Sequence, residues 1–301
     1  MGWRFVMVQQ AAELSVRRRQ LVIQTGAECS SVPLEDLNTL LLESRQSHIT
    51  TAALSVLAEE GVALLVCDET HLPCGILMPY AQHSRHFSVV ETQLKASQPR
   101  KNRLWQQIVR MKIKNQSLCL RLQGLGDSAD SLDAYAKNVL SGDSGNMEAA
   151  AASLYFRALF GRGFRRGQDN GVNAALNYGY AILRGLIART LALYGFLSCL
   201  GLHHGNDLNA FNLTDDMMEP FRPLVDLYAA EHTSTDMVLT THEKRDLLAL
   251  MTMEVRMEGQ RYSVFTAADR MVQSLSRAMQ APGQPGLSLP ELMPLARHLN
   301  E

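Results

Sequence analysis

The stretch that decides the fold is KASQPRKNRLWQQIVRMKIKNQSLCLRL, residues 95 to 122. Its apolar residues recur at the spacing of one helix face, which carries Leu104, Ile108, Met111, Ile113, Leu118 and Leu122. Before residue 92 the pattern is different, because short runs of β-branched and bulky apolar residues alternate with turns. This change of period predicts a β-rich N-terminal part and a helical C-terminal part.

Towards the N-terminus, the sequence predicts strands at residues 3 to 8, 20 to 24, 37 to 43, 62 to 67 and 75 to 79. The cluster Arg17 to Arg19 is compatible with a hairpin, and residues 50 to 60 are typical of a short helix. We therefore expect an α+β fold. It consists of a small β-rich dimerisation domain (1–80), a polar linker (81–91) and a larger all-α catalytic domain (92–301).

Towards the C-terminus, helices are expected at residues 147 to 160, 172 to 200, 217 to 230, 242 to 257 and 267 to 279. Residues 281 to 290 are expected to form a loop, and residues 290 to 299 one or two last turns. The apolar run from Tyr178 to Leu202 contains Arg184 and Arg189, which are costly in a bilayer, so it is interpreted as a buried helix.

The charge of the chain is uneven. Its net charge of −1 gives no overall attraction to nucleic acid. Residues 95 to 121, however, carry eight basic side chains and no acidic one, and a second basic stretch covers residues 157 to 189. Either a solvated face or a DNA-binding face would explain this pattern. The DNA-binding hypothesis names Arg100, Lys101, Arg103, Arg110, Lys112, Lys114, Arg165, Arg166 and Arg184.

Several other functions fit poorly. The five cysteines are odd in number and form no CxxC pair, which favours a reduced cytosolic interior. There is no GxSxG nucleophile motif, and the stretch GRGFRRG (161–167) lacks the Gly-Lys-Ser/Thr ending of a phosphate loop. The first ten residues lack the pattern of a signal peptide, so a cytoplasmic location is expected.

Possible metal ligands gather in HHGNDLNAFNLTDDMMEPFRPLVD, residues 203 to 226, directly after an apolar helix. Carboxylates with an imidazole suit Mn²⁺ or Mg²⁺, although paired histidines are often only structural. A further candidate is Glu148, expected in the first turn of a helix with Asn146 as N-cap. A glutamate there usually complements the helix dipole, so it becomes a ligand candidate only with partners nearby.

Several ordered blocks resemble the integrase subunit of CRISPR adaptation, the Cas1 family, and particularly its type II branch. The resemblance rests on PLEDLNTLLLES (33–44), GNMEAAAASLYFRALF (145–160), NAALNYGYAILRG (173–185) and the histidine-containing segment 203–226. It implies a metal-dependent DNA endonuclease and integrase that inserts foreign DNA into a CRISPR array by attack of a 3′-hydroxyl on a repeat-end phosphodiester. A branched-DNA repair nuclease and a non-catalytic DNA-bridging scaffold are the alternatives.

The resemblance also implies the site and its partners. Glu148, His204 and Glu219 would hold Mg²⁺ or Mn²⁺ and be catalytic, while the choice between His203 and His204 stays open. His203 would support the site or contact DNA, and Asn177 would support the site or touch phosphate, with simple packing as the alternative for Asn177. The implied partners are a second copy of the chain, the small adaptation subunit Cas2 and double-stranded DNA, and no membrane. Whether the RNA-guided effector nuclease also takes part is left open.

Overall fold

The N-terminal part contains two four-stranded sheets. The computed structural model describes residues 2–79, 83–280 and 286–298. The first sheet has the order β1-β5-β7-β8, formed by Arg4–Val8, Leu37–Leu42, Ala63–Cys67 and Pro73–Leu77, with only β8 antiparallel to its neighbour. The second has the order β4-β3-β2-β6, formed by Glu28–Pro33, Gln20–Thr25, Glu13–Arg17 and His48–Ile49. Helix α1 (Thr51–Glu59) and the short 3-10 turn η1 (Leu34–Asp36) complete this part.

A hairpin does turn at the arginine cluster, but its first strand is β2, which the sequence did not predict, and not the predicted strand at residues 3 to 8, which pairs with β5 in the other sheet. Arg17 of β2 pairs with Gln20 of β3, and the two residues between them turn the chain. Arg18 and Arg19 both have positive φ, 49° and 59°. Two left-handed residues in a two-residue loop match the twist of the flanking strands, which explains why so short a turn closes this hairpin.

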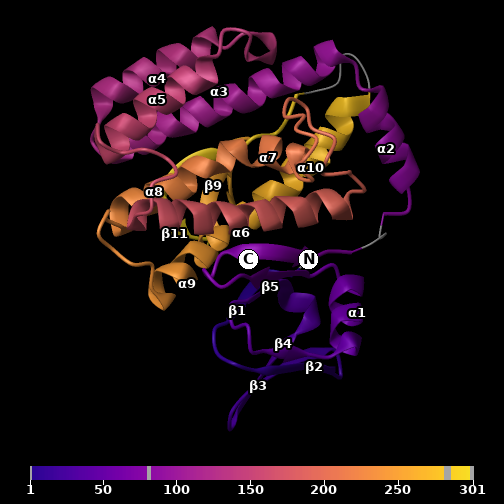
Figure 1. The fold of residues 1–301 in the computed structure, drawn as a ribbon. Coiled ribbons are helices and arrows are strands. Elements are labelled where there is room, and N and C mark those ends of the chain that lie inside the picture. Colours follow the sequence, from indigo (N-terminus) through magenta and orange to yellow (C-terminus); the bar gives the residue numbers. More distant parts are fainter. Residues whose placement is uncertain (1, 80–82, 281–285, 299–301) are drawn as a thin grey trace.

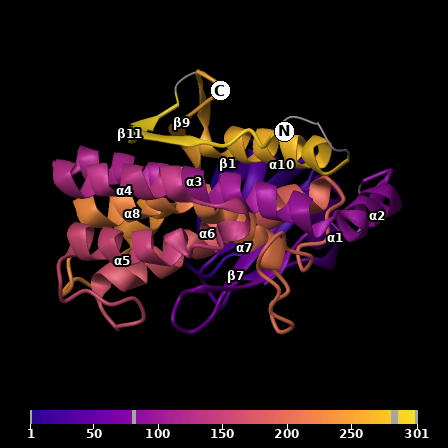
Figure 2. The same ribbon diagram turned by 90° about the horizontal axis from the view of Figure 1, so that it is seen from above.

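The C-terminal part is mainly helical (Figures 1 and 2). Its helices are α2 (His86–Lys95), α3 (Gln98–Leu122), α4 (Gly126–Asn138), α5 (Met147–Phe160), α6 (Gly171–Leu193), α7 (Asn212–Met218), α8 (Arg222–His232), α9 (Thr241–Ala249) and α10 (Val264–Gln280). Three 3-10 turns join some of them: η2 (Ser141–Asp143), η3 (Glu219–Phe221) and η4 (Leu250–Thr252). The predicted fold class, β-rich and then helical, is confirmed.

Helix α6 forms the middle of the molecule, between the first sheet and the other helices (Figure 1). Two glycines permit this close packing. A Cβ on Gly179 would lie 2.5 Å from Val225 Cγ1 of α8, and a Cβ on Gly185 would lie 2.9 Å from a methyl group of Leu65 in β7. Helix α6 is buried, as expected, but it ends at Leu193 instead of residue 200. None of the described helices is long and apolar enough to cross a membrane.

Three other predictions for the C-terminal part were wrong in detail. Residues 86 to 91 belong to α2 instead of an irregular linker. The helix expected to reach residue 257 ends at Ala249, and the last turns expected at 290 to 299 are a strand. The C-terminal part is therefore not all-α as expected, because a third sheet forms in the order β10-β9-β11, from Gln260–Ser263, Met253–Met257 and Glu291–Arg297. Its first strand directly follows α9 and η4, so its residues continued the helical pattern in the sequence.

The expected loop is described in part. Residues 281 to 285 lie outside the described residues, and residues 286 to 290 have no regular secondary structure, as predicted. The domain boundaries at residues 80 and 92 stay a prediction.

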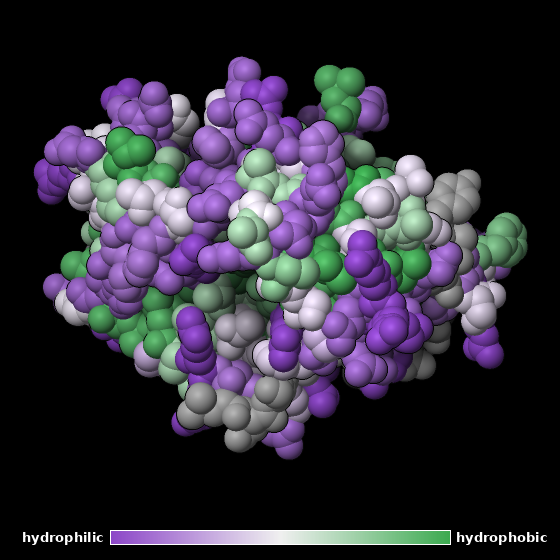
Figure 3. All heavy atoms as spheres, turned by 90° about the horizontal axis from the view of Figure 1, so that it is seen from below, coloured by the Kyte–Doolittle hydropathy of each residue, from purple (hydrophilic) through white to green (hydrophobic). Residues whose placement is uncertain are grey.

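The two parts of the chain are joined by buried polar contacts as well as by apolar packing. Arg189 of α6 donates from Nε to the carbonyl of Gly61 at 2.5 Å, and Lys244 of α9 forms an ion pair with Glu43, directly after β5. Seen from below, the molecule is covered mainly by hydrophilic residues, with apolar residues gathered in smaller patches (Figure 3). The large apolar side chains are mostly used inside the two cores.

Candidate functional site

The inner face of α3 carries Lys112 to the centre of the candidate site. Its ammonium lies 2.6 Å from Oε1 of Glu148 and 2.5 Å from Oε2 of Glu219, and the residue is only 8% exposed. The prediction that Lys112 lies on an open DNA-binding face was therefore wrong. The apolar stripe of α3 wraps further around the helix than the sequence pattern indicated, and it takes Lys112 inside with it.

Burial lowers the pKa of Lys112, because it disfavours the charged amine. The two carboxylates outweigh this effect and hold the pKa above its ordinary value. The ammonium is thus kept charged by the glutamates that it joins.

Glu148 is placed by the start of α5. The predicted helix bounds, residues 147 to 160, are confirmed, but the predicted cap was wrong. Asn146 has a left-handed backbone with φ of 52° and makes no side-chain capping bond. Instead, the carboxylate of Asp143 accepts from the backbone N–H groups of Met147 and Glu148 at 2.9 and 3.0 Å. Asp143 therefore supplies the capping oxygens, and the first turn that holds Glu148 is fixed.

Glu219 is placed at the junction of α7 and η3 and is nearly inaccessible, with its side chain 4% exposed. Its Oε1 lies 2.7 Å from Nη1 of Arg222. The backbone beside it is held by Asn115 of α3, whose amide donates to the carbonyl of Pro220 at 2.7 Å. The same amide donates to Pro290 and accepts from Leu292, so the C-terminal strand also bears on this junction.

Charge determines the state of Glu219. Burial alone raises its pKa, but Arg222 and Lys112 outweigh burial and lower the pKa to about 2. Oε2 is buried, and the ammonium of Lys112 lies 2.5 Å from it. The carboxylate is therefore ionised, and Lys112 balances the charge on this oxygen.

His204 is oriented by Asp216, a carboxylate of the same segment 203–226. Asp216 is fully buried and accepts from the backbone N–H groups of Leu202, His203 and His204 at 2.6, 3.0 and 3.2 Å. Its Oδ1 also lies 2.6 Å from Nδ1 of His204, and this hydrogen bond raises the pKa of His204. Because Nδ1 faces Asp216, the other ring nitrogen, Nε2, is the one left for a ligand.

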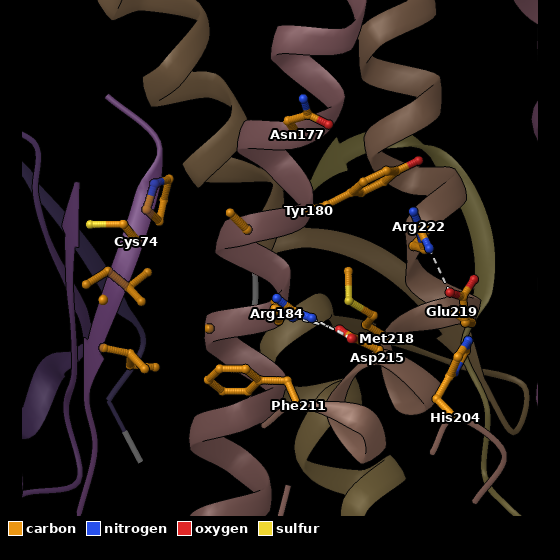
Figure 4. Close-up of a pocket in the computed structure, with 16 residues that line it drawn as sticks. Cys74, Asn177, Tyr180, Arg184, His204, Phe211, Asp215, Met218, Glu219 and Arg222 are labelled. Carbon is orange, nitrogen blue, oxygen red and sulfur yellow. Dashed lines mark hydrogen bonds and ion pairs between the residues drawn. The ribbon is translucent and has the colours of Figure 1, made fainter. Parts of the chain in front are cut away.

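The neighbouring histidine has a different role. The ring of His203 stacks on the buried indole of Trp105, with centroids 4.5 Å apart and planes within 2°. His204 lies beside Glu219 and directs its ring towards it (Figure 4). This arrangement favours His204 over His203 as the ligand, a choice that the sequence left open.

A cavity of about 680 Å³ opens beside these residues, along α6 and between β8 and the junction that carries Glu219 (Figure 4). His204 and Glu219 line one side of it, and Cys74 of β8 lies on the other. Arg184 lines the cavity but is held by Asp215, with Nη2 2.5 Å and Nε 2.7 Å from its carboxylate oxygens. Asn177 also lines the cavity, but its side-chain oxygen accepts from Arg166 at 2.8 Å and not from a residue of the glutamate cluster.

The remaining basic residues are only partly free. Arg100 donates to the carbonyl of Ala278, Arg110 donates to the carbonyl of Val139, and Lys114 forms an ion pair with Glu291. Lys101 is half-buried, whereas Arg103, Arg110, Lys114 and Arg165 are exposed. Arg103, Arg110 and Lys114 are spaced so that they share one outward face of α3. DNA binding by this outward face stays a prediction.

The three predicted ligands lie near one another but do not yet form a ligand set. Among the described residues, no three histidine, cysteine or acidic side chains converge closely enough to hold a metal ion as they stand. Glu148 and Glu219 share the ammonium of Lys112, and both contribute to the raised pKa of His204. Two carboxylates and one imidazole nitrogen are the donor types that Mg²⁺ and Mn²⁺ accept, so the residues fit such an ion if Lys112 leaves.

Comparison with known proteins gives a consistent picture. The family model described as CRISPR associated protein Cas1 matches residues 5–258. The chain is 45% identical over 304 aligned residues to the "CRISPR-associated endonuclease Cas1" of Neisseria meningitidis serogroup C (strain 8013), and the match covers 100% of both.

Two solved structures share the fold. A casposase bound to integration product has a TM-score of 0.72 at 16% identity, covering 91% of this chain and 89% of that one. A chain of a Cas6-RT-Cas1–Cas2 complex has a TM-score of 0.71 at 19% identity, covering 91% of this chain and 34% of that one. At these identities the likeness concerns the fold.

Proposed function

The chain belongs to the CRISPR-associated Cas1 family, and on that premise we propose that it is a metal-dependent DNA endonuclease and integrase of CRISPR adaptation. The observation that carries the proposal is the meeting of Glu148 and Glu219 at one buried cation, with His204 beside them. The two glutamates are 71 positions apart in the sequence, and the fold brings both to the same buried ammonium. The full-length relative, named an endonuclease, supports the activity.

Glu148, His204 and Glu219 are the proposed ligands of Mg²⁺ or Mn²⁺. The bound ion would polarise the phosphoryl oxygen and stabilise negative charge on the attacking and leaving oxygens. Each ligand has a supporting residue in this chain. Asp143 fixes the helix start of Glu148, Arg222 and Asn115 fix Glu219, and Asp216 aims the imidazole of His204. Carboxylates that support a ligating histidine are a common feature of metal sites.

The proposed reaction exchanges one phosphodiester for another. The 3′-hydroxyl of the incoming DNA gives up its proton to solvent as its oxygen forms a bond to phosphorus. The bond from that phosphorus to the 3′-oxygen of the repeat strand breaks, and the leaving oxygen takes up a proton from solvent. With water in place of the 3′-hydroxyl, the same site hydrolyses DNA. The cavity beside His204 and Glu219 would receive the reacting phosphodiester, and Arg184 at its wall would have to exchange its partner Asp215 for a phosphate.

The proposed macromolecular partners are double-stranded DNA, the small subunit Cas2 and a second copy of the chain. The two solved structures support the first two, because one is bound to an integration product and the other is part of a complex with Cas2. The exposed arginines and lysine of α3 would contact phosphates without reading bases, so DNA binding would weaken steeply with added salt. We also propose a cytoplasmic location, which the five free cysteines support.

An in vitro strand-transfer assay tests the proposal. The protein is mixed with Cas2, a duplex with free 3′-ends and a repeat-containing plasmid, with MnCl₂ or with EDTA. We expect joined products only with the metal. Joining that is indifferent to EDTA would contradict the metal mechanism, DNA bridging without strand breakage would indicate a scaffold, and cleavage of branched DNA without any joining would indicate a repair nuclease.

A further inference from the structure

Lys112 has an unusual position for a lysine in a DNA-processing protein. It is 8% exposed, and its ammonium contacts the two glutamates of the site. A flexible, strongly hydrated amine is seldom buried without a specific partner. This burial is local, because Lys114, two residues further along α3, has an exposed side chain that pairs with Glu291.

The ammonium faces the oxygens that a metal ion would need. It approaches Oε1 of Glu148 and Oε2 of Glu219, while the other oxygen of Glu219 is taken by Arg222. Lys112 is thus the cation that compensates Oε2 of Glu219, with its ammonium 2.5 Å away. A divalent ion binds carboxylate oxygens at about 2.0 to 2.2 Å, so it would claim the same oxygens from the same side.

The two cations exclude each other. An ammonium that remained within hydrogen-bond distance of both oxygens would lie against the metal ion, and like charges repel strongly where water is scarce. Lysine has a flexible four-carbon stem, so its ammonium can withdraw while α3 stays in place. Glu148, with its side chain 23% exposed, borders the more open side of the site.

We propose that Lys112 is a built-in counter-ion, a positioning residue that occupies the place of the divalent ion between Glu148 and Glu219 and is displaced when that ion binds. The identity of the ion rests on the proposed function. In the metal-free protein Lys112 holds two mutually repelling carboxylates at the distance needed for a shared cation. The cost of this arrangement is weaker metal binding, since each binding event must first break two ion pairs.

The test is to measure Mn²⁺ binding by isothermal titration calorimetry in wild type, Lys112→Met and Lys114→Met. Methionine keeps the length of the stem and removes the charge. We expect Lys112→Met to bind Mn²⁺ about 10-fold more tightly or better, and Lys114→Met, two residues further along α3 and outside the site, to bind as the wild type does. Equal or weaker binding by Lys112→Met would overturn the proposal.

Thermal unfolding gives a second readout that does not depend on activity. In EDTA, Lys112→Met should melt below wild type, because the glutamates face each other without a cation. Addition of MnCl₂ should then raise its Tm by more than it raises that of wild type, since tighter binding to the folded state stabilises it further. A rise no larger than in wild type would count against the proposal.

A charge-preserving variant covers the case in which Lys112→Met does not fold. Lys112→Arg keeps a cation between the glutamates and can bind both by paired hydrogen bonds, so it should yield less readily and bind Mn²⁺ more weakly than wild type. Unchanged affinity in Lys112→Arg would overturn the proposal. Absence of Mn²⁺ binding in wild type and in every variant would instead refute the proposed metal site, and with it the proposed function.

Discussion

Glu148 and Glu219 meet at the same ammonium but arrive in different surroundings. Glu219 has its side chain 4% exposed and is also paired with Arg222, whereas the Glu148 side chain is 23% exposed and has Lys112 as its cationic partner. Glu219 sits at a junction fixed by Asn115, while Glu148 lies at the tip of a helix. Glu219 is therefore part of the buried core, whereas Glu148 lies at its edge.

This difference separates folding from chemistry. A carboxylate surrounded by two buried cations stabilises the fold as well as the site, because its loss leaves those cations uncompensated. A partly exposed carboxylate can be lost while water replaces it. The two glutamates should therefore contribute equally to catalysis and unequally to stability.

The largest effect is expected for Glu219→Ala. It leaves Lys112 and Arg222 without their shared anion, so strand transfer should be abolished and the free energy of unfolding should fall by about 3 to 5 kcal/mol. Urea unfolding followed by circular dichroism measures the second quantity. A variant as stable as wild type would show that Glu219 is not part of the core.

Glu148→Ala should abolish strand transfer to the same extent at a much smaller structural cost. Removing a partly exposed carboxylate should lower the free energy of unfolding by about 1 kcal/mol, because Asp143 still caps α5. The same two assays apply, together with a gel-shift measurement of duplex binding, which should be nearly unchanged. Full strand-transfer activity would remove Glu148 from the site.

Asp216→Ala tests the third ligand. Without its carboxylate, His204 loses the hydrogen bond to Nδ1 that fixes its ring, so the affinity for Mn²⁺ should fall by about 10- to 100-fold. Because Asp216 also accepts three backbone bonds, Asp216→Asn serves as the milder comparison. Calorimetry of both variants gives the affinities, and unaltered Mn²⁺ binding in each would argue against His204 as a ligand.

A buried carboxyl, Asp226, lies near Glu219 and gives a test by pH. Burial raises its pKa to about 6, and it accepts from the hydroxyl of Tyr180, whose ring lies under Arg222. A carboxyl whose pKa is higher in the folded state contributes stability at low pH, and that contribution is lost as the pH rises from about 4 to about 6. Asp226→Asn does not titrate.

The Tm of Asp226→Asn relative to wild type should therefore increase as the pH is raised from about 4 to about 7. Thermal melts in matched buffers measure this difference. A Tm difference that stays constant with pH would show that Asp226 titrates normally in the folded protein.

The smallest effect is expected on the outer face of α3. Arg103→Ala removes one exposed charge, so the slope of log affinity for duplex DNA against log salt concentration should fall by about 0.9 if that side chain contacts a phosphate. Fluorescence anisotropy at several salt concentrations gives the slope. An unchanged slope would place the DNA elsewhere.

Much of the helical fold could be predicted from the sequence, because α3, α5 and α6 carry long periodic patterns. Strands β9 and β11 could not, since the residues of β9 continue the helical pattern of α9 and β11 pairs with residues at least 35 positions away. The segment 203–226 was found by its composition and the choice of ligands came from the resemblance, but no local signal showed that Glu148 and Glu219 meet.

Lys112 was missed for a related reason. Its charge placed it with Arg110 and Lys114, although its position on α3 places it with the buried residues Ile108, Val109 and Asn115. A basic side chain within an apolar stripe is a signal of a buried acidic partner. The partner itself lies on other elements, so only the fold can identify it. The role of Asp216 was likewise hidden, because its partners are backbone groups of a loop.

The most direct test of the account is anomalous diffraction at the manganese edge from crystals of the protein grown with MnCl₂. We expect one strong peak bounded by Glu148, Glu219 and Nε2 of His204, with the ammonium of Lys112 withdrawn from both carboxylates. A manganese peak elsewhere, with Lys112 still between the two glutamates, would contradict it.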